Sequence, residues 1–229
     1  MKSGAVSAIK SALVPAGTRP RKVAFGLYKG LTFDLDLRCE SQLYLGLWER
    51  ETYRSIQQAV GRFVWAIDVG AGSGELCIRL LRTAATGPIF AFEPQASRVA
   101  VLRHNAALNH CADDSRLIIV DKLAGTTTAD GSLAIDDLPI DLLRRGFLKV
   151  DVDGAEMLVL EGARKVLSQG EVDVLVETHS AALERQCIEF LSHCRYRCAV
   201  IPNAWWRRLI PEQRPIEHNR WLWATRSAA

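Results

Sequence analysis

The fold of this chain is decided by one glycine-rich stretch, Ile67-Asp68-Val69-Gly70-Ala71-Gly72-Ser73-Gly74-Glu75. The run that leads into it, residues 63–69, is almost uninterrupted apolar, which is typical of a strand buried on both faces. A helical pattern follows at once. Because glycines between a strand and a helix allow a tight reversal and a close approach of a ligand to the backbone, the stretch predicts a nucleotide-type binding turn.

Beyond this turn, short apolar runs alternate with helical patterns. After the strand at 63–69, the pattern predicts further strands at 89–93, 117–120, 147–151, 172–177, 197–201 and 221–225. Helices are expected at 75–85, 95–109, 155–167 and 183–191. Repeated β-α units favour parallel strands joined by right-handed crossovers. We therefore expect an α/β fold with a doubly wound, mostly parallel, seven-stranded, Rossmann-like sheet.

The chain is expected to have three parts. Residues 1–22 carry scattered basic residues among small ones and are predicted to be a flexible tail. Residues 23–62 form an N-terminal cap, in which Val23 to Leu27 and Leu31 to Leu37 make a β-hairpin and residues 49–60 make a helix. Residues 63–229 form the binding domain.

Composition limits the classes of partner. The chain has 229 residues, 48% of them hydrophobic, and a net charge of +3, which is too small to indicate a nucleic-acid partner. Its apolar runs fall short of the roughly 20 residues that span a bilayer, so we expect no membrane span. The spacing of the six cysteines matches no usual zinc or redox pair and requires no disulfide, so we expect a cytoplasmic protein. A homodimer is compatible with the sequence.

The spacing of the glycines favours S-adenosylmethionine (SAM) over a dinucleotide. A dinucleotide turn has the pattern G-x-G-x-x-G, whereas this chain has G-x-G-x-G, preceded by Asp68 in the strand end. Asp68 suits an ammonium group, and the following helix N-terminus suits a carboxylate. Glu93 ends the next strand and can accept hydrogen bonds from ribose hydroxyls. The plainer alternative is that Asp68 caps a turn and Glu93 is a surface acid.

Several further segments carry a recognisable pattern: 67–71, 91–94 with Leu102 and Asn105, the block Lys149-Val150-Asp151-Val152-Asp153-Gly154-Ala155-Glu156, then 160–163 and 174–179. These segments resemble the FkbM-type methyltransferases, a branch of the class I SAM-dependent enzymes. The resemblance covers roughly residues 63–180, and Ser73 departs from the pattern common in the family. It implies a class I methyltransferase fold, SAM as cofactor, and methylation of a hydroxyl group on a sugar or other small molecule.

The cofactor is expected to lie along the turn, the second strand end and the neighbouring helix. The predicted cofactor contacts are Asp68, Gly70, Ala71, Gly72, Gly74, Glu75, Glu93, Pro94, Asn105 and Asp121.

Three side chains at the fourth and fifth strand ends are candidates for catalysis. Asp151 ends one strand, and Glu177 and His179 end the next, where ligands of such sheets bind. His179 has a suitable ordinary pKa of about 6.5 for a general base, with Asp151 and Glu177 as alternatives. A structural or positioning role is the favoured explanation of His179, because a lone histidine after a strand is often a hydrogen-bonded structural residue. Asp151, Asp153 and Glu177 could offer oxygen ligands to Mg²⁺ or Ca²⁺, but turn and positioning roles also explain them, so we expect no bound metal.

The acceptor is expected to be a small molecule, such as a glycan. Enzymes that methylate exocyclic amino nitrogens usually carry an Asn/Asp-Pro-Pro-aromatic turn after the fourth strand, and this chain has Asp151-Val152-Asp153-Gly154 instead. Two other functions remain open: an NAD-dependent oxidoreductase, which the glycine spacing disfavours, and a SAM-binding module without catalysis. The residues expected near the acceptor are Asp153, Glu156, Tyr44, Trp48 and Trp205, with Glu49 also shaping the pocket.

Overall fold

The computed structural model describes residues 14, 16–83, 86–129, 131–208, 210 and 218–226, so most of the predicted tail lies outside the described residues. A seven-stranded sheet with the order β10-β11-β9-β8-β3-β4-β5 forms its centre. The predicted doubly wound sheet is therefore confirmed. Its strands are β3 Trp65–Val69, β4 Ile89–Phe92, β5 Leu117–Val120, β8 Gly146–Val150, β9 Val172–Thr178, β10 Tyr196–Ile201 and β11 Arg220–Arg226.

The direction of the strands fixes where a ligand can bind. β3, β4, β5, β8 and β9 are parallel, whereas β11 is antiparallel to both β9 and β10. The chain builds outward from β3 through β4 to β5, and then returns to the other side of β3 with β8. The order thus reverses between β3 and β8, and at such a switch point a crevice opens at the carboxyl ends of the strands.

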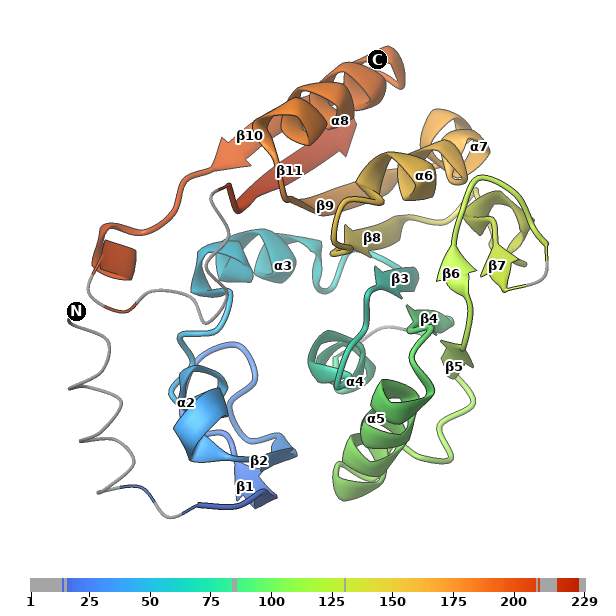
Figure 1. Ribbon diagram of the computed structural model, residues 1–229. Helices are drawn as coiled ribbons and strands as arrows, with labels where there is room; N and C mark the ends of the chain where they lie inside the picture. The colour runs from blue at the N-terminus through green and yellow to red at the C-terminus, as the bar shows by residue number, and fades with distance from the viewer. Residues whose placement is uncertain are drawn as a thin grey trace.

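Helices cover both faces of the sheet (Figure 1). α3 Tyr53–Ala59, α4 Glu75–Leu81 and α5 Ala96–Leu108 lie on one face. α6 Glu156–Glu161, α7 Arg164–Gln169 and α8 Ala181–His193 lie on the other. Alternate strand residues enter the two cores: Phe147 packs with the first set of helices and Leu148 with the second. This two-sided burial explains why the strands are apolar at nearly every position.

The N-terminal cap differs from its prediction in detail. The hairpin exists, but its first strand is β1 Arg19–Lys22, inside the segment predicted as tail, and its second is β2 Thr32–Leu35. The apolar run that begins at Val23 instead forms the connection between these two strands, since residues 27–30 are a turn. A helix that was not predicted, α2 Leu37–Tyr44, follows β2, and its N-terminus is capped by the Asp36 carboxylate. The predicted helix at 49–60 is a short 3-10 turn, η1 Arg50–Thr52, followed by α3.

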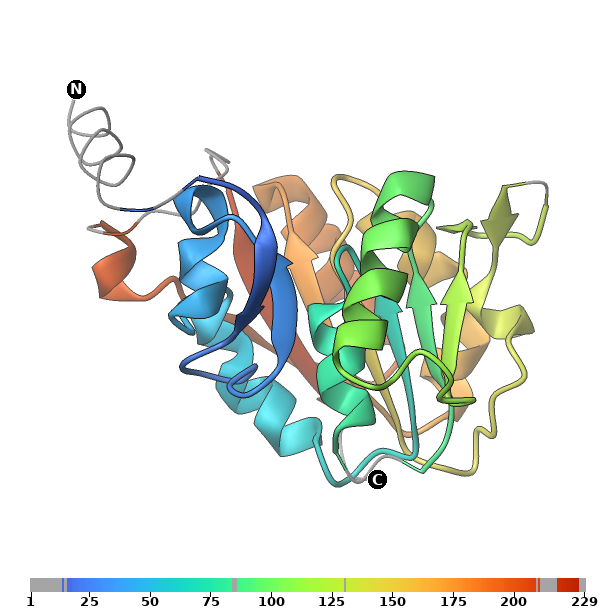
Figure 2. The same ribbon diagram turned by 90° about the horizontal axis from the view of Figure 1, so that it is seen from below.

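The cap is fastened to the sheet domain at two places. Asn109 and Asn105 of the α5 segment accept hydrogen bonds from the backbone N–H groups of Thr32 (2.8 Å) and Asp34 (3.2 Å). On the other side, the 3-10 turn η3 Trp205–Arg208 between β10 and β11 brings Arg207 against the cap. Figure 2 shows the hairpin and α2 beside the central sheet rather than within it.

The single helix predicted at 155–167 is two helices, α6 and α7. A Cβ on Gly162 would lie 1.8 Å from the backbone oxygen of Gly125, so the chain passes too close to its neighbour for a helical side chain there. The Asp136 carboxylate then accepts hydrogen bonds from the N–H groups of Lys165 and Val166 and caps the new helix. Asp136 lies in η2 Ile135–Asp137, which follows two short paired strands, β6 Leu123–Ala124 and β7 Ser132–Leu133; none of these was predicted.

Within the described residues, every helix is too short or too polar to cross a bilayer. All six cysteines are free thiols.

Candidate active site

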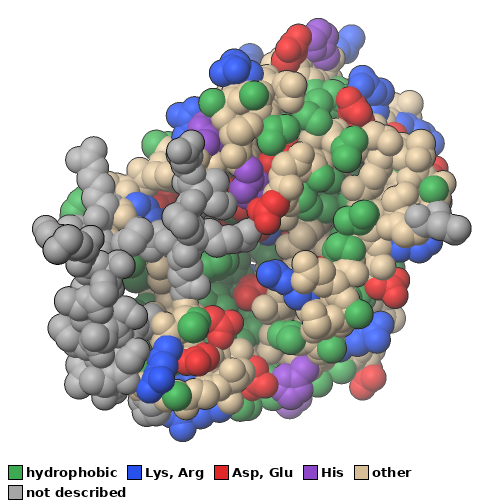
Figure 3. Space-filling model, viewed as in Figure 1, with side chains coloured by type: hydrophobic (Ala, Val, Ile, Leu, Met, Phe, Trp, Pro, Cys, Tyr) green, Lys and Arg blue, Asp and Glu red, His purple; other side chains and the backbone are tan. Residues whose placement is uncertain are grey.

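A cavity of about 300 Å³ lies where the sheet order reverses, between the carboxyl ends of β3 and β8 and the N-terminal cap. In the space-filling view the molecule is hollowed near the middle of this face, and acidic side chains lie around the hollow (Figure 3). Both the sheet domain and the cap contribute to its wall. The lining residues are Tyr28, Glu40, Leu43, Trp48 and Glu49 from the cap, and Asp68, Gly70, Ala71, Gly72, Ser73, Glu75, Leu76, Arg98, Lys149 and Asp151 from the sheet domain.

The glycine turn forms the floor of the cavity. All three of its glycines have a positive φ, with Gly70 at 78°. A Cβ on Gly70 would lie 1.9 Å from the backbone oxygen of Asp151, so the turn and the β8 end touch through bare backbone. The N–H groups of Gly70 and Ala71 donate to the carbonyl of Phe92 at 3.0 and 2.9 Å, which fixes the turn against β4.

Asp68 is a buried carboxylate that faces this cavity without a hydrogen bond. It is 1% exposed, and neither of its oxygens has a hydrogen-bond partner among the described residues. Lys149 Nζ lies 3.7 Å from Asp68 Oδ1. Burial raises the pKa of Asp68 above its usual value, and Lys149 opposes the shift. An unsatisfied buried acceptor at a cavity wall is suited to a ligand that brings a hydrogen-bond donor or a positive charge.

Lys149 is the site residue to which the sequence prediction gave no role. Its register partner on β3 is Asp68, so the two side chains lie on the same face of the sheet. Its Nζ is also 3.0 Å from Asp151 Oδ2. Burial lowers the pKa of Lys149, but the carboxylates Asp151 and Asp68 outweigh it and hold that pKa well above its usual value. A lone charge within the apolar strand 146–150 was the signal for this residue, because a lysine is seldom buried unless it is paired.

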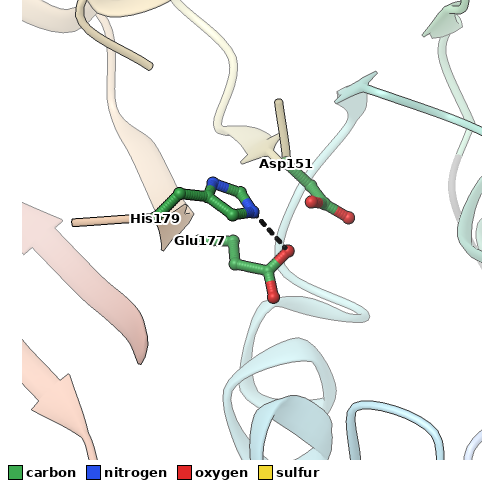
Figure 4. Close-up of side chains that lie close together, drawn as sticks. All are labelled: Asp151, Glu177 and His179. Carbon is green, nitrogen blue, oxygen red and sulfur yellow. Dashed lines mark ion pairs between the residues drawn. The ribbon is translucent and has the colours of Figure 1, made fainter. Parts of the chain in front are cut away.

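Asp151 and Glu177 form a carboxyl pair at the ends of β8 and β9 (Figure 4). Burial, a hydrogen bond to Asp151 and the negative charge of Asp151 raise the pKa of Glu177 to about 11, so Glu177 is protonated at neutral pH. Although burial favours its neutral form, Lys149 and the hydrogen bond from Glu177 hold the pKa of Asp151 well below its usual range. Asp151 lines the cavity, whereas Glu177 does not.

His179 is enclosed by carboxylates. Its Nδ1 lies 2.7 Å from Glu156 Oε1, and its Nε2 lies 3.2 Å from Asp153 Oδ1 and 3.6 Å from Glu177 Oε2. Burial by itself lowers the pKa of His179, but the Glu156 hydrogen bond and the nearby acids raise it by more. The pKa of His179 therefore lies above its usual value. Glu156 is fully buried and also accepts the backbone N–H of His179, so its contacts support a role in orienting the imidazole. His179, Asp153 and Glu156 lie outside the cavity lining.

Asp151, Glu177 and His179 could also hold a metal ion, because one ligand atom from each lies within 4.8 Å of the others. His179 thus takes the place that Asp153 had in the predicted oxygen set. Asp151 already has Lys149 as a counter-ion and a hydrogen bond from protonated Glu177. Metal binding here stays untested.

The predicted cofactor contacts fall into two groups. Asp68, Gly70, Ala71, Gly72 and Glu75 line the cavity, while the other five lie beyond it. Glu93 accepts hydrogen bonds from the N–H groups of Gly72 (3.1 Å) and Gln95 (2.9 Å) and so braces the turn from the β4 side. Asn105 braces it from α5, because its Nδ2 donates to the Ser73 carbonyl at 2.9 Å. Gly74 is buried against Leu102, and Pro94 and Asp121 are exposed at the ends of β4 and β5.

The predicted acceptor residues of the cap and the late loop are distributed differently. Trp48 lines the cavity, Tyr44 packs against the hydrophobic core, and Trp205 is 78% exposed on η3.

Burial raises the pKa of Glu75, at the start of α4, to about 7. Tyr28, Glu40 and Arg98 also line the cavity, and no sequence signal marked them. The position of Tyr28 and Glu40 depends on how the cap folds back, and that of Arg98 on how α5 packs beside the glycine turn.

Comparisons with known proteins support the predicted fold and the predicted resemblance to a family. The model of the "Methyltransferase FkbM domain" family matches residues 130–198, which contain the Lys149 to Glu156 block and the end of β9. The predicted resemblance to the FkbM-type methyltransferases is thus confirmed by that segment. No curated protein matches the sequence significantly.

Solved structures of methyltransferases share the fold. An FkbM methyltransferase from Methylobacillus flagellatus KT has a TM-score of 0.57 and 18% identity over 80% of this chain and 53% of its own. A SAM-dependent O-methyltransferase from Thermotoga maritima has a TM-score of 0.53 and 17% identity over 78% of this chain and 65% of its own. A ribosomal protein L11 methylase from Lactobacillus delbrueckii subsp. bulgaricus has a TM-score of 0.52 and 14% identity over 78% of each chain.

These structures define the class. The chain has the class I SAM-dependent methyltransferase fold, and its residues 130–198 are similar to the FkbM methyltransferase domain. The chain spans about half the length of the first of these structures. The second is named for methyl transfer to oxygen and the third for methylation of ribosomal protein L11. The fold therefore leaves the acceptor open.

The residues of the cavity fit SAM, the expected cofactor of this fold. The Asp68 carboxylate, which accepts no hydrogen bond from a described residue, suits the ammonium group of its methionine part, and the bare backbone of the glycine turn lets the ligand approach closely. The carboxyl groups that line the cavity are five, Glu40, Glu49, Asp68, Glu75 and Asp151, against the two cations Arg98 and Lys149. Burial raises the pKa of Glu49 and of Glu75, and a ligand with a net positive charge would favour their ionised forms.

Proposed function

We propose that this protein is a SAM-dependent methyltransferase that methylates a hydroxyl oxygen of a sugar or another small molecule. The observation that carries the proposal is the cavity at the reversal of the sheet. Asp68, which accepts no hydrogen bond from a described residue, lines it together with the glycine turn and Asp151.

The chain's own residues would hold the cofactor at the turn. Asp68 would bind the ammonium group, and the backbone of residues 70–74 would follow the ligand. Glu93 and Asn105 keep that backbone in place from β4 and α5, and Glu93 would meet the ribose if it exchanged one of its present backbone donors. When bound, SAM supplies an electrophilic methyl group on a sulfonium sulfur.

The acceptor would lie between the β8 end and the cap. Asp151 stays ionised beside Lys149 and can accept a hydrogen bond from an acceptor hydroxyl, which would fix the direction of attack. Glu177 and His179 lie next to Asp151 and outside the cavity lining, and Glu156 would orient the imidazole of His179. The turn that follows β8 lacks the Pro-Pro-aromatic sequence of amino-group methyltransferases, which favours oxygen as the acceptor atom.

The test has two stages. Calorimetric titration of the purified protein with SAM, S-adenosylhomocysteine and NAD should give binding of the first two and none of NAD. Radiolabelled methyl transfer from SAM into extracts of the native organism, followed by identification of the labelled compound, should then give a methyl ether. Binding of NAD alone would mean an oxidoreductase, and SAM binding without any labelled product would mean a non-catalytic module.

The predicted role of His179 as general base is tested separately. If His179 takes the proton, His179→Ala should lower turnover while SAM affinity stays within about twofold. Unchanged turnover would remove that role. A metal at Asp151, Glu177 and His179, a homodimer, a glycan acceptor, a cytoplasmic location and the three-part division of the chain stay predictions.

A further inference from the structure

Glu49 is a cavity residue with an unusual backbone. It lies in the cap, between α2 and η1, with φ 47° and ψ 31°, which is the left-handed region. Among the described residues, Glu49, His110 and Arg195 are the non-glycine positions with a positive φ, and Glu49 alone of the three lines the cavity. Such a conformation is strained for a residue with a side chain, and strain of this kind clusters at functional sites.

The Glu49 carboxylate is available to a ligand. It makes no hydrogen bond or ion pair with any described residue, although it contributes to the cavity wall. Burial raises the pKa of Glu49 to about 8; Lys149 opposes the shift, and the nearby acids Asp151, Glu75 and Asp68 increase it. Glu49 is therefore mostly protonated at neutral pH, and a positive charge brought into the cavity would favour the ionised form that can accept a proton.

The other acids near the cavity are less free to take a proton. Asp151 is bound to Lys149 and Glu177, and its pKa is held low. Glu40 accepts the backbone N–H of Asp36 at 2.8 Å. Asp68 and Glu75 lie at the glycine turn, where the cofactor would bind.

Glu177 and His179, the candidates at the strand ends, are less suited to accept the proton for another reason. Glu177 is already protonated, and both residues lie outside the cavity lining. Glu49 instead lines the cavity from the cap, and the charges of Lys149 and Asp151 at the β8 end act on its carboxyl group.

We propose that Glu49 is the catalytic residue that receives the acceptor's proton, an inference that rests on the proposed function. The acceptor's O–H bond breaks and its proton moves to a Glu49 Oε atom. The oxygen forms its new bond to the methyl carbon of the sulfonium donor, and the electron pair of the broken C–S bond stays on sulfur. The cap thereby supplies chemistry as well as shape, and the acceptor must place its hydroxyl between Glu49 and the β8 end.

A test that needs no acceptor uses two ligands of the turn. Sinefungin is a SAM analogue with an amine-bearing carbon in place of the methylated sulfur, and S-adenosylhomocysteine lacks both the methyl group and the charge. We expect Glu49→Gln to weaken sinefungin binding about tenfold and S-adenosylhomocysteine binding less than twofold, because a charged amine at that position gains a charge-assisted contact with Glu49. The control Glu171→Gln removes a 72% exposed carboxylate that lies outside the cavity lining, and it should change neither. Equal losses for both ligands would overturn the assignment of Glu49.

A second measurement follows turnover, with SAM and the native extract as probes. Glu49→Gln should lower labelled product formation about 100-fold, a usual effect of losing a general base. Glu49→Gly should lower it as much while raising the melting temperature, since glycine relieves the left-handed strain. His110→Gly, at φ 57° on an exposed turn, should stabilise without affecting turnover.

The outcomes separate the two proposals. A wild-type protein that binds neither SAM nor S-adenosylhomocysteine overturns the proposed function itself. A wild-type protein that methylates, with Glu49→Gln equally active, overturns the role of Glu49 alone.

Discussion

The two walls of the cavity are built in different ways. The glycine turn is held by backbone: Gly70 touches the Asp151 carbonyl, and Gly70 and Ala71 donate to Phe92. The cap is held by side chains from distant parts of the sequence: Asn105 and Asn109 of the α5 segment, and Arg207 of η3. The turn thus presents a fixed surface to the part of the ligand common to all reactions of this fold. The cap presents Trp48, Glu49 and Tyr28, which are free to differ as the acceptor differs.

This contrast predicts that substitutions in the turn and substitutions in the cap affect different properties of the protein. Loss of the turn should abolish cofactor binding. Loss of the cap should spare cofactor binding and remove turnover. Four changes test this, in decreasing order of expected effect.

Gly70→Ala should have the largest effect. The new Cβ would meet backbone 1.9 Å away at a positive φ, and neither the β8 end nor the turn can move without breaking the sheet register. We expect a loss of about 4 kcal/mol in the free energy of unfolding, a melting temperature about 12 °C lower, and no SAM binding by calorimetry. Gly30→Ala is the control, since Gly30 has φ 90° with open space around it and should cost about 1 kcal/mol. Equal effects would mean that backbone strain alone, and not the close contact, matters at Gly70.

Arg207→Met should loosen the cap. Arg207 makes two 2.8 Å hydrogen bonds to the Glu51 carboxylate and one of 3.0 Å to Gln42, and its removal leaves Glu51 buried without its counter-ion. We expect a loss of about 3 kcal/mol in chemical denaturation, with the affinity for S-adenosylhomocysteine changed less than threefold. The double variant Arg207→Met with Glu51→Leu should recover part of the loss, because no unpaired charge remains. A double variant as unstable as the single one would contradict this account.

Asn105→Ala tests the link between the two walls. Its side chain donates to Ser73 in the turn and accepts from the N–H of Asp34 in the cap, so its removal leaves two buried groups without partners. We expect a loss of about 2 kcal/mol, measured by urea denaturation. Asn105→Asp keeps the acceptor for Asp34 but loses the donor to Ser73, so it should weaken SAM binding more than it disturbs the cap. If both variants leave SAM binding intact, Asn105 serves the cap alone.

The smallest effect is the pH dependence contributed by Glu49. Burial raises its pKa from the ordinary value of 4.5 to about 8. The native state therefore binds the proton more tightly than the unfolded state, and this stabilising contribution is complete below pH 4.5 and is lost as the pH rises towards 8. Thermal melts should show Glu49→Gln gaining about 1 kcal/mol of stability over the wild type between pH 5 and pH 6. Glu75 titrates in both proteins, so the difference isolates Glu49, and a difference that does not vary with pH would contradict the prediction.

Much of the sheet could be predicted because its signals are local. Each of the seven strands overlaps a predicted segment, since a strand covered on both faces is apolar along its whole length. Helices broken or created by distant contacts could not be predicted. The break at Gly162 depends on the backbone of Gly125, and the start of α7 depends on Asp136, neither of which is near in sequence.

The site residues also divide into those that local sequence indicated and those that only tertiary contacts reveal. The glycine turn, Asp68, Glu93 and the Asp151 block followed from the sequence, because the type of residue at a strand end indicates the chemistry of that edge. Lys149 lay within the same block and was left without a role, since only the register opposite Asp68 shows that it neutralises two acids.

The sequence by itself determined a doubly wound sheet, a turn of three glycines at the end of β3, and the acids at the neighbouring strand ends. It did so because strand burial and turn geometry depend on residues adjacent in the chain. Only the tertiary structure decided which acids meet the cavity and in what state of ionisation. Burial and pairing set the pKa of Glu177, Asp151 and Glu49 in different directions, and both depend on contacts between strands and a cap that are far apart in the sequence.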